Sequence, residues 1–151
     1  MELRLGARAV EVNVTKHATE SESKVLSAAL NVFPPDLRNN IVWERSAVQG
    51  HYGNPIVFYR AVVEGEQAEM TAKYILSSLD KTSLRYLLST LESRIDKQGN
   101  LYLRLHKQYL VDGRIIAWDG DDVVKVIIKI GRKQEELEDL LRKTLTNAEP
   151  E

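Results

Sequence analysis

A strict alternation of side chains between residues 101 and 106 constrains the fold more than any other feature of this chain. Three leucines alternate there with an aromatic, a cationic and an imidazole side chain: Leu101, Tyr102, Leu103, Arg104, Leu105 and His106. Successive side chains of a β-strand point to opposite faces of the sheet, so the segment predicts a strand with one leucine face. That face needs a hydrophobic core against it, and the opposite face carries groups suited to binding.

Periodicity and turn residues predict five strands and four helices in the order β-α-β-β-α-α-β-β-α. Strands are expected near residues 7–15, 40–48, 56–64, 100–110 and 124–130, and residues 115–118 are compatible with a further short strand. The first helix is expected to follow residues 17–20 and to end at Pro34, because proline stops a helix. Two more are expected across 65–95, with an interruption at 80–83, and a last one from 133 to 145.

These elements place the chain in the α+β class, with a mostly antiparallel or mixed sheet and helices packed on one face. Its 151 residues fit one domain, and we expect residues 146–151 to be frayed. Hydrophobic residues make up 43% and charged residues 28%, which is typical of a globular protein. No apolar run approaches a membrane span and the first residues lack a signal-peptide core, so we expect a cytoplasmic protein without membrane contact.

No arrangement of residues in the sequence predicts a metal centre or a catalytic site. The chain has no cysteine, and its three histidines (His17, His51 and His106) lack the close spacing of metal ligands. The carboxylates of 119–122 are better explained as turn residues than as a magnesium site. The glycines of 50–53 precede a strand, which excludes a phosphate-binding loop. We therefore expect neither a cofactor nor an enzymatic activity.

Basic and aromatic side chains gather on the expected strands, which favours a binding surface over a catalytic site; for the 101–106 strand alone, an ordinary solvated face of an antiparallel sheet is the more common explanation. Arginine and lysine bind phosphate oxygens and aromatic rings stack on bases, so such a sheet can hold RNA. With 21 basic and 22 acidic residues, RNA would have to bind a local patch, to which Arg45 and Arg60 are expected to lie close. The candidate RNA-binding residues are His51, Tyr52, Asn54, Tyr102, Arg104, His106, Lys107, Gln108, Lys125 and Lys129.

Four motifs occur in order along the chain: HATE at 17–20, HYGNPI at 51–56, GNLYLRLHKQ at 99–108 and DGDDV at 119–123. Together, over roughly residues 8–130, they resemble the archaeal family described as a predicted RNA-binding exosome subunit. The resemblance implies a fold like that of the ribosomal large-subunit protein that contacts the small ribosomal RNA. It carries no established catalytic residue. The chain departs from the family pattern at His106, where aspartate is usual.

The sequence leaves two functions open. The first is a non-catalytic RNA-binding accessory protein, with RNA and the exosome or other RNA-processing proteins as partners. The alternative is a protein–protein adaptor or homodimeric module without direct RNA contact, which the near-neutral net charge favours. An enzyme that uses the histidines or the carboxylates of 119–122 ranks last.

Overall fold

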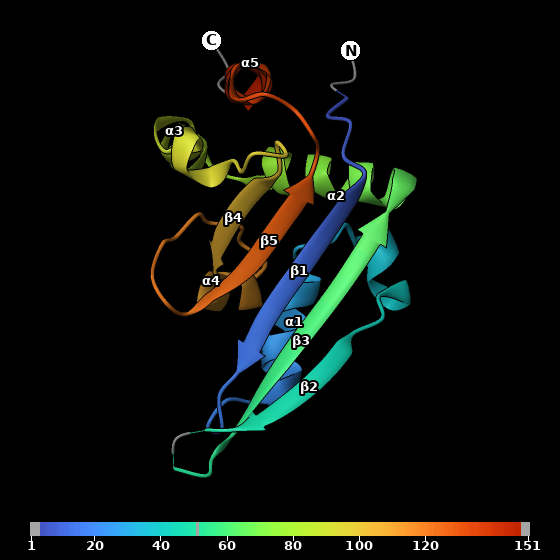
Figure 1. Ribbon diagram of the computed structural model, residues 1–151, viewed down its shortest axis with the longest axis vertical. Coiled ribbons are helices and arrows are strands. Elements are labelled where there is room, and N and C mark those ends of the chain that lie inside the picture. The colour runs from blue at the N-terminus through green and yellow to red at the C-terminus, as the bar shows by residue number, and fades with distance from the viewer. Residues whose placement is uncertain (1–3, 51, 149–151) are drawn as a thin grey trace.

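The sheet of this protein is open and consists of five antiparallel strands in the order β2-β3-β1-β5-β4 (Figure 1). The computed structural model describes residues 4–50 and 52–148, with side chains up to residue 146. The strands are β1 (Ala9–Lys16), β2 (Glu44–Gln49), β3 (Pro55–Glu64), β4 (Leu101–His106) and β5 (Val123–Lys129). The predicted α+β class is confirmed, and the sheet contains no parallel pair within the described residues.

Helices cover one face of the sheet and leave the other face open. They are α1 (Glu22–Leu30), α2 (Gly65–Ser78), α3 (Lys81–Ser89), α4 (Lys107–Val111) and α5 (Gln134–Ala148), with the short 3-10 helices η1 (Pro35–Asn40) and η2 (Leu91–Arg94). Figure 1 shows α1, α2 and α4 behind the sheet, and α5 near α3 at one end. The predicted order holds, except that α4 lies between the last two strands.

Alternation along each inner strand decides which side chains meet the helices. Leu101, Leu103 and Leu105 are each 1% exposed, whereas Tyr102 on the opposite face is accessible to solvent. The predicted orientation of β4 is therefore confirmed. The other inner strands bury alternate residues in the same core: Val10, Val12, Val14, Val57, Tyr59, Ala61, Val63, Val124, Val126 and Ile128.

Strand β4 is shorter than predicted because the chain turns into α4 at His106. The backbone of His106 is extended, and its Nδ1 accepts a hydrogen bond from the Tyr109 backbone N–H at 3.3 Å. A side chain that satisfies a free amide in this way is a helix N-cap. Residues 107–110, which the leucine alternation alone would not exclude from the strand, therefore form a helical turn.

The two edge strands of the sheet differ. A segment of the 112–122 loop lies along the outer edge of β4, where the His106 N–H donates to the Ile116 carbonyl at 2.9 Å and the Trp118 N–H donates to the Arg104 carbonyl at 3.0 Å. This contact is a single β-bridge instead of the short strand expected at 115–118. Within the described part of the chain, β2 pairs with β3 and with no other strand.

The C-terminal helix is longer than predicted. Helix α5 continues to Ala148 instead of ending near residue 145, and residues 149–151 lie outside the described part of the chain. Leu137 and Leu141 anchor it to the core. None of the helices in residues 4–50 and 52–148 is long and apolar enough to cross a membrane.

Candidate functional site

One row of side chains crosses all five strands on the open face. The strand registers place Glu44 of β2 opposite Arg60 of β3, and Arg60 opposite Asn13 of β1. Asn13 lies opposite Lys125 of β5, and Lys125 lies opposite Arg104 of β4. Directly opposed residues on one face of a sheet are close neighbours. We call these five residues the transverse row, because they line up across the strands.

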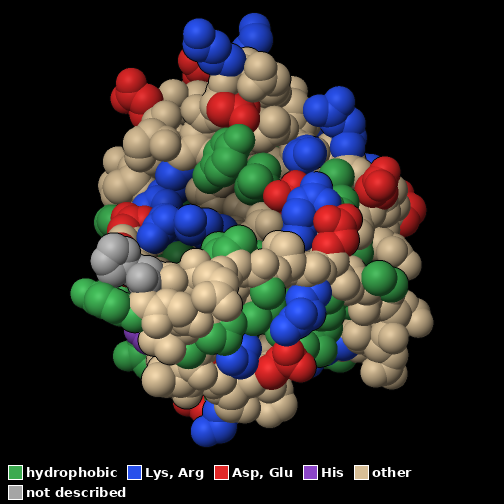
Figure 2. Space-filling model, turned by 60° about the horizontal axis from the view of Figure 1, so that its bottom comes forward, with side chains coloured by type: hydrophobic (Ala, Val, Ile, Leu, Met, Phe, Trp, Pro, Cys, Tyr) green, Lys and Arg blue, Asp and Glu red, His purple; other side chains and the backbone are tan. Residues whose placement is uncertain are grey.

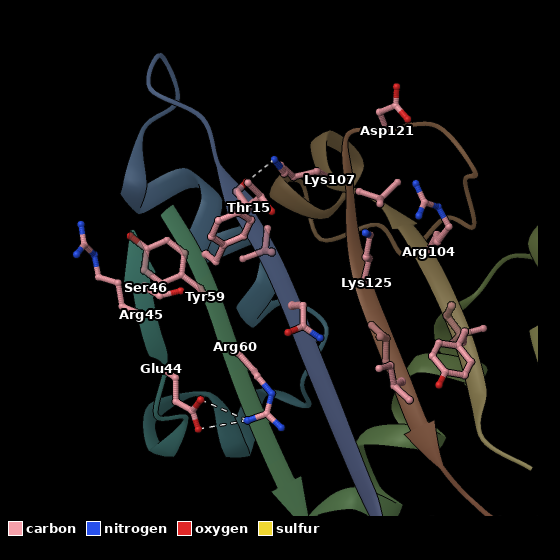
Figure 3. A pocket seen from close by; sticks show the side chains of 18 of the residues that line it. Thr15, Glu44, Arg45, Ser46, Tyr59, Arg60, Arg104, Lys107, Asp121 and Lys125 are labelled. Atoms are coloured by element: carbon pink, nitrogen blue, oxygen red, sulfur yellow. Dashed lines mark hydrogen bonds and ion pairs between the residues drawn. The ribbon is translucent and has the colours of Figure 1, made fainter. Parts of the chain in front are cut away.

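The transverse row lies in a hollow of about 780 Å³ on the open face. In Figure 3, Lys125 and Arg104 extend from adjacent strands on one side of this hollow, and Arg60 extends on the other side. Figure 2 shows Lys and Arg side chains around a hollowed area, with Asp and Glu side chains beside them. The face is therefore a patch of mixed charge with local cationic positions.

The cations of the transverse row differ in whether they form ion pairs within the protein. Arg60 forms ion pairs with Glu11 at 3.0 Å and with Glu44 at 3.2 Å. Burial raises the pKa of Glu11, but hydrogen bonds from Arg60 and Asn13 outweigh it and hold that pKa below its usual value. Lys125 is exposed and forms no ion pair with any described residue. Lys125 is thus the cation of the row best placed to meet an external anion.

Arg104 uses only part of its guanidinium within the protein. Its Nη2 donates to the Gly120 carbonyl at 2.6 Å, while its buried Nε has no hydrogen-bond partner among the described residues. A guanidinium has five N–H donors in a planar fork that matches a phosphate. Arg104 is therefore held in position by the 112–122 loop. Its Nη1, which bonds to none of the described residues, is the donor left for an anion, because the buried Nε is inaccessible.

Two partly exposed aromatic rings flank the cations on the open face. The Tyr102 hydroxyl donates to Asp96 Oδ2 at 2.9 Å, and this bond raises the pKa of Tyr102 and keeps the phenol neutral. The second ring belongs to Phe58, which lies opposite Thr15 and Ser46. Phe58 was not among the binding residues predicted from the sequence, because it stands within an apolar run. Phe58 and Arg60 are two residues apart in a strand and therefore share a face, and this spacing is the sequence signal that could have identified Phe58 as a surface residue.

Lys107 was expected to contact RNA, but its placement indicates a structural role. It is 2% exposed, and its Nζ donates to the Thr15 carbonyl at 2.9 Å. The same ammonium pairs with Glu20 at 3.1 Å and with Asp122 at 2.7 Å. These contacts join the end of β1, the turn before α1 and the loop before β5, and they leave Lys107 no free donor for a phosphate.

His106 is likewise occupied within the protein, since it caps α4 and its ring lies 4.3 Å from that of Tyr109. Aspartate is among the preferred N-cap residues. The aspartate usual in the family pattern and the histidine of this chain can therefore both serve as the N-cap of α4 at position 106.

The remaining candidate residues do not line the hollow. Tyr52 and Asn54 lie exposed at the tip of the β2–β3 hairpin, at one end of the sheet (Figure 1). Gln108 is exposed on α4, and Lys129 lies opposite Ala9, on the open face but beyond the transverse row. His51 lies outside the described residues. Of the candidates, the structure thus brings together Tyr102, Arg104, Lys107 and Lys125 at the hollow, and of the three cations only Lys107 has all its donors occupied within the protein.

Two acidic side chains lie close to Arg104: Asp121 lines the hollow and is exposed, whereas Asp119 lines a smaller depression beside Tyr102 and is held by a hydroxyl group and a cation. The Tyr86 hydroxyl donates to Asp119, and Arg94 pairs with the same carboxylate at 3.0 Å. The Tyr86 hydrogen bond lowers the pKa of Asp119, as does the pairing with Arg94, although burial opposes both. Across the part of the chain that the structure describes, no three histidine, aspartate or glutamate side chains are grouped as metal ligands.

Comparison with known proteins gives consistent matches over most of the chain. The model of a family described as RNA binding matches residues 9–130. RNA-binding protein PAB1135 of Pyrococcus abyssi is 29% identical over 129 residues, which are 84% of each chain. Protein MJ0213 of Methanocaldococcus jannaschii is 31% identical over 123 residues, or 78% of this chain and 80% of the relative.

Solved structures share the same fold. The crystal structure of protein SSO0741 from Sulfolobus solfataricus matches with a TM-score of 0.78 and 30% sequence identity, over 92% of this chain and 98% of that one. Protein AF2318 from Archaeoglobus fulgidus matches with a TM-score of 0.73 and 28% identity, over 91% of this chain and 99% of the other.

Proposed function

Because this chain belongs to the RNA-binding family whose model matches residues 9–130, we propose that its open sheet face is the surface that binds RNA. Lys125 and Arg104 contact phosphate oxygens, and Tyr102 and Phe58 lie beside bases or sugars. The observation that carries this assignment is the transverse row, in which Lys125, unpaired among the described residues, lies opposite Arg104, whose Nη1 bonds to none of them.

The physical chemistry of the face supports a local, backbone-directed contact. Phosphate contacts by lysine and arginine provide affinity without reading sequence, and partly exposed rings add stacking. The carboxylates that pair with Arg60 are distant from Arg104, because Glu11 lies on β1, two strands from β4, and Glu44 lies on β2, four strands from it. The cationic contact is therefore concentrated on β5 and β4.

A salt titration of RNA affinity tests this surface. The double variant Lys125→Ala with Arg104→Ala is expected to weaken binding to many RNAs alike and to lower the salt slope by roughly 1.4 units on single strands. Lys24→Ala with Lys143→Ala removes the same charge from exposed positions on α1 and α5 and serves as the matched control. Fluorescence anisotropy measures both, after circular dichroism has shown that each variant is folded.

Stacking is tested separately from charge. Tyr102→Ala is expected to cost about 1–3 kcal/mol of binding free energy if a base stacks there, with little change in the salt slope. If the folded wild type binds no RNA at low salt, or if the double variant binds as tightly as the control, the open face is only a solvated surface. The adaptor or homodimer then becomes the better explanation.

An accessory role at the RNA-degrading exosome is supported by the four sequence motifs at 17–20, 51–56, 99–108 and 119–123. In this role the protein acts in the cytoplasm, holds RNA and does not cleave it. Affinity purification from the source organism would recover exosome subunits together with the protein. Incubation of labelled RNA with the pure protein and a divalent cation would leave the RNA length unchanged.

A further inference from the structure

A cluster of aromatic side chains lies at the β4 edge, next to the hollow described above. The ring of His106 lies 4.3 Å from that of Tyr109 and 5.3 Å from that of Trp118. The guanidinium of Arg114 covers the Tyr109 ring at 4.7 Å. Trp118 remains 49% exposed, although it is the largest apolar side chain of the cluster. Exposed rings of this size are characteristic of binding sites.

The strand register places Trp118 at the end of the transverse row. Ala117 bridges Leu105 in an antiparallel sense, so the next residue, Trp118, lies opposite Arg104. The hydrogen bond from the Trp118 N–H to the Arg104 carbonyl, at 3.0 Å, confirms this pairing. Opposed residues point to the same face. The indole therefore extends the row beyond Arg104, on the open side of the sheet.

The loop holds this indole in a fixed position. A Cβ on Gly120 would lie 2.2 Å from Trp118 Nε1, so the ring packs against a backbone position that only glycine leaves open. The Gly120 carbonyl accepts from Arg104 Nη2, and the neighbouring Asp119 is held by Arg94. A ring fixed before binding loses little conformational entropy when a ligand stacks on it.

We propose that Trp118 is a stacking platform for an unpaired base of single-stranded RNA whose phosphates lie along Arg104 and Lys125. This inference rests on the proposed RNA-binding function and specifies its ligand. Bases within a duplex are stacked on each other and cannot pack on a side chain, whereas unpaired bases can. Stacking also supplies affinity that a face of mixed charge does not supply through phosphate contacts alone.

Tryptophan fluorescence tests the platform directly, because the chain has two tryptophans. Trp43 is partly buried and packs edge-to-face on Phe33, 6.3 Å away, so Trp43→Phe leaves Trp118 as the single reporter. Titration of this variant with a single-stranded RNA of about ten nucleotides is expected to quench its fluorescence. A blunt duplex of the same sequence is expected to give no such quenching.

Affinity measurements then separate stacking from charge. Trp118→Ala is expected to bind the single strand roughly 5- to 150-fold more weakly, with an unchanged salt slope. Trp118→Phe keeps a ring at the position and is expected to recover most of the affinity. Trp43→Phe, outside the site, should bind like the wild type.

The outcomes distinguish this inference from the function on which it depends. Wild-type protein that binds no RNA overturns both. Wild-type binding that Lys125→Ala weakens and Trp118→Ala leaves intact overturns the platform alone. Equal quenching by duplex and single strand also overturns it, because only the two terminal pairs of the duplex have a free face, whereas every unpaired base has one.

Discussion

The substitution Lys107→Met tests whether the Lys107 ammonium stabilises the fold or binds RNA. The substitution keeps an unbranched apolar stem in the buried site but removes the ammonium that bonds to the Thr15 carbonyl, Glu20 and Asp122. Removal of one partner from a buried ion pair costs about 3–5 kcal/mol. Because the side chains of Glu20 and Asp122 remain 21% and 52% exposed, they can be rehydrated. We therefore expect the free energy of unfolding to fall by about 2–3 kcal/mol.

Urea denaturation followed by circular dichroism measures this loss, and Lys125→Met is the matched control. Lys125 is exposed and unpaired among the described residues, so its substitution should change the free energy of unfolding by less than about 0.5 kcal/mol. RNA affinity should show the reverse pattern, with a loss for Lys125→Met and little change for folded Lys107→Met. An unchanged denaturation midpoint combined with lost RNA binding in Lys107→Met would refute the structural assignment.

The same variant should alter the dependence of stability on pH. Burial raises the pKa of Asp122, but the hydrogen bond and charge of Lys107 outweigh it, so that pKa lies below its usual value. A lowered folded-state pKa contributes stability that is present above the unfolded-state pKa and lost as the pH falls through the folded-state pKa. Without Lys107 this contribution shrinks, so the stability of Lys107→Met should decline less steeply on acidification over that range.

Two further substitutions test the packing and capping on which the site depends. Leu103→Ala should lower the free energy of unfolding by about 2–5 kcal/mol, because it empties a fully buried position; a loss below 1 kcal/mol in urea denaturation would contradict the assigned packing. Asp80→Ala removes the side chain that accepts the Ser83 N–H at 2.7 Å and should cost about 1 kcal/mol, measured as a lower melting temperature, whereas Asp80→Asn should retain most of the cap.

Local patterns in the sequence were sufficient to predict the strands that build the open face. The alternation of 101–106 gave the correct buried face, and the break at 80–83 corresponds to the Asp80 cap between α2 and α3. Both features depend on residues that are close in the sequence. Each could therefore be recognised without knowledge of the rest of the fold.

The parts of the site that the sequence did not reveal depend on contacts between distant segments. Lys107 stands in a polar part of the 99–108 motif that suggests solvent exposure. Only its ion pairs with Glu20 and Asp122 show that it is buried. Trp118 was placed in a short expected strand, but its role depends on its register against Arg104. Neither the order of strands nor the pairing of charges across them is encoded by spacing along the chain.

The unequal edges of the sheet restrict how this protein could associate through its backbone. The 112–122 loop occupies the outer hydrogen-bonding groups of β4 near Arg104 and His106, so an added strand would have to displace it there. Among the described residues, β2 has no neighbour beyond β3, and all six of its residues are exposed. Two copies joined antiparallel at β2 would form one ten-stranded sheet with both open faces on the same side. Recruitment of a second molecule at that edge would widen the open face without obstructing the β4 edge, which carries Trp118.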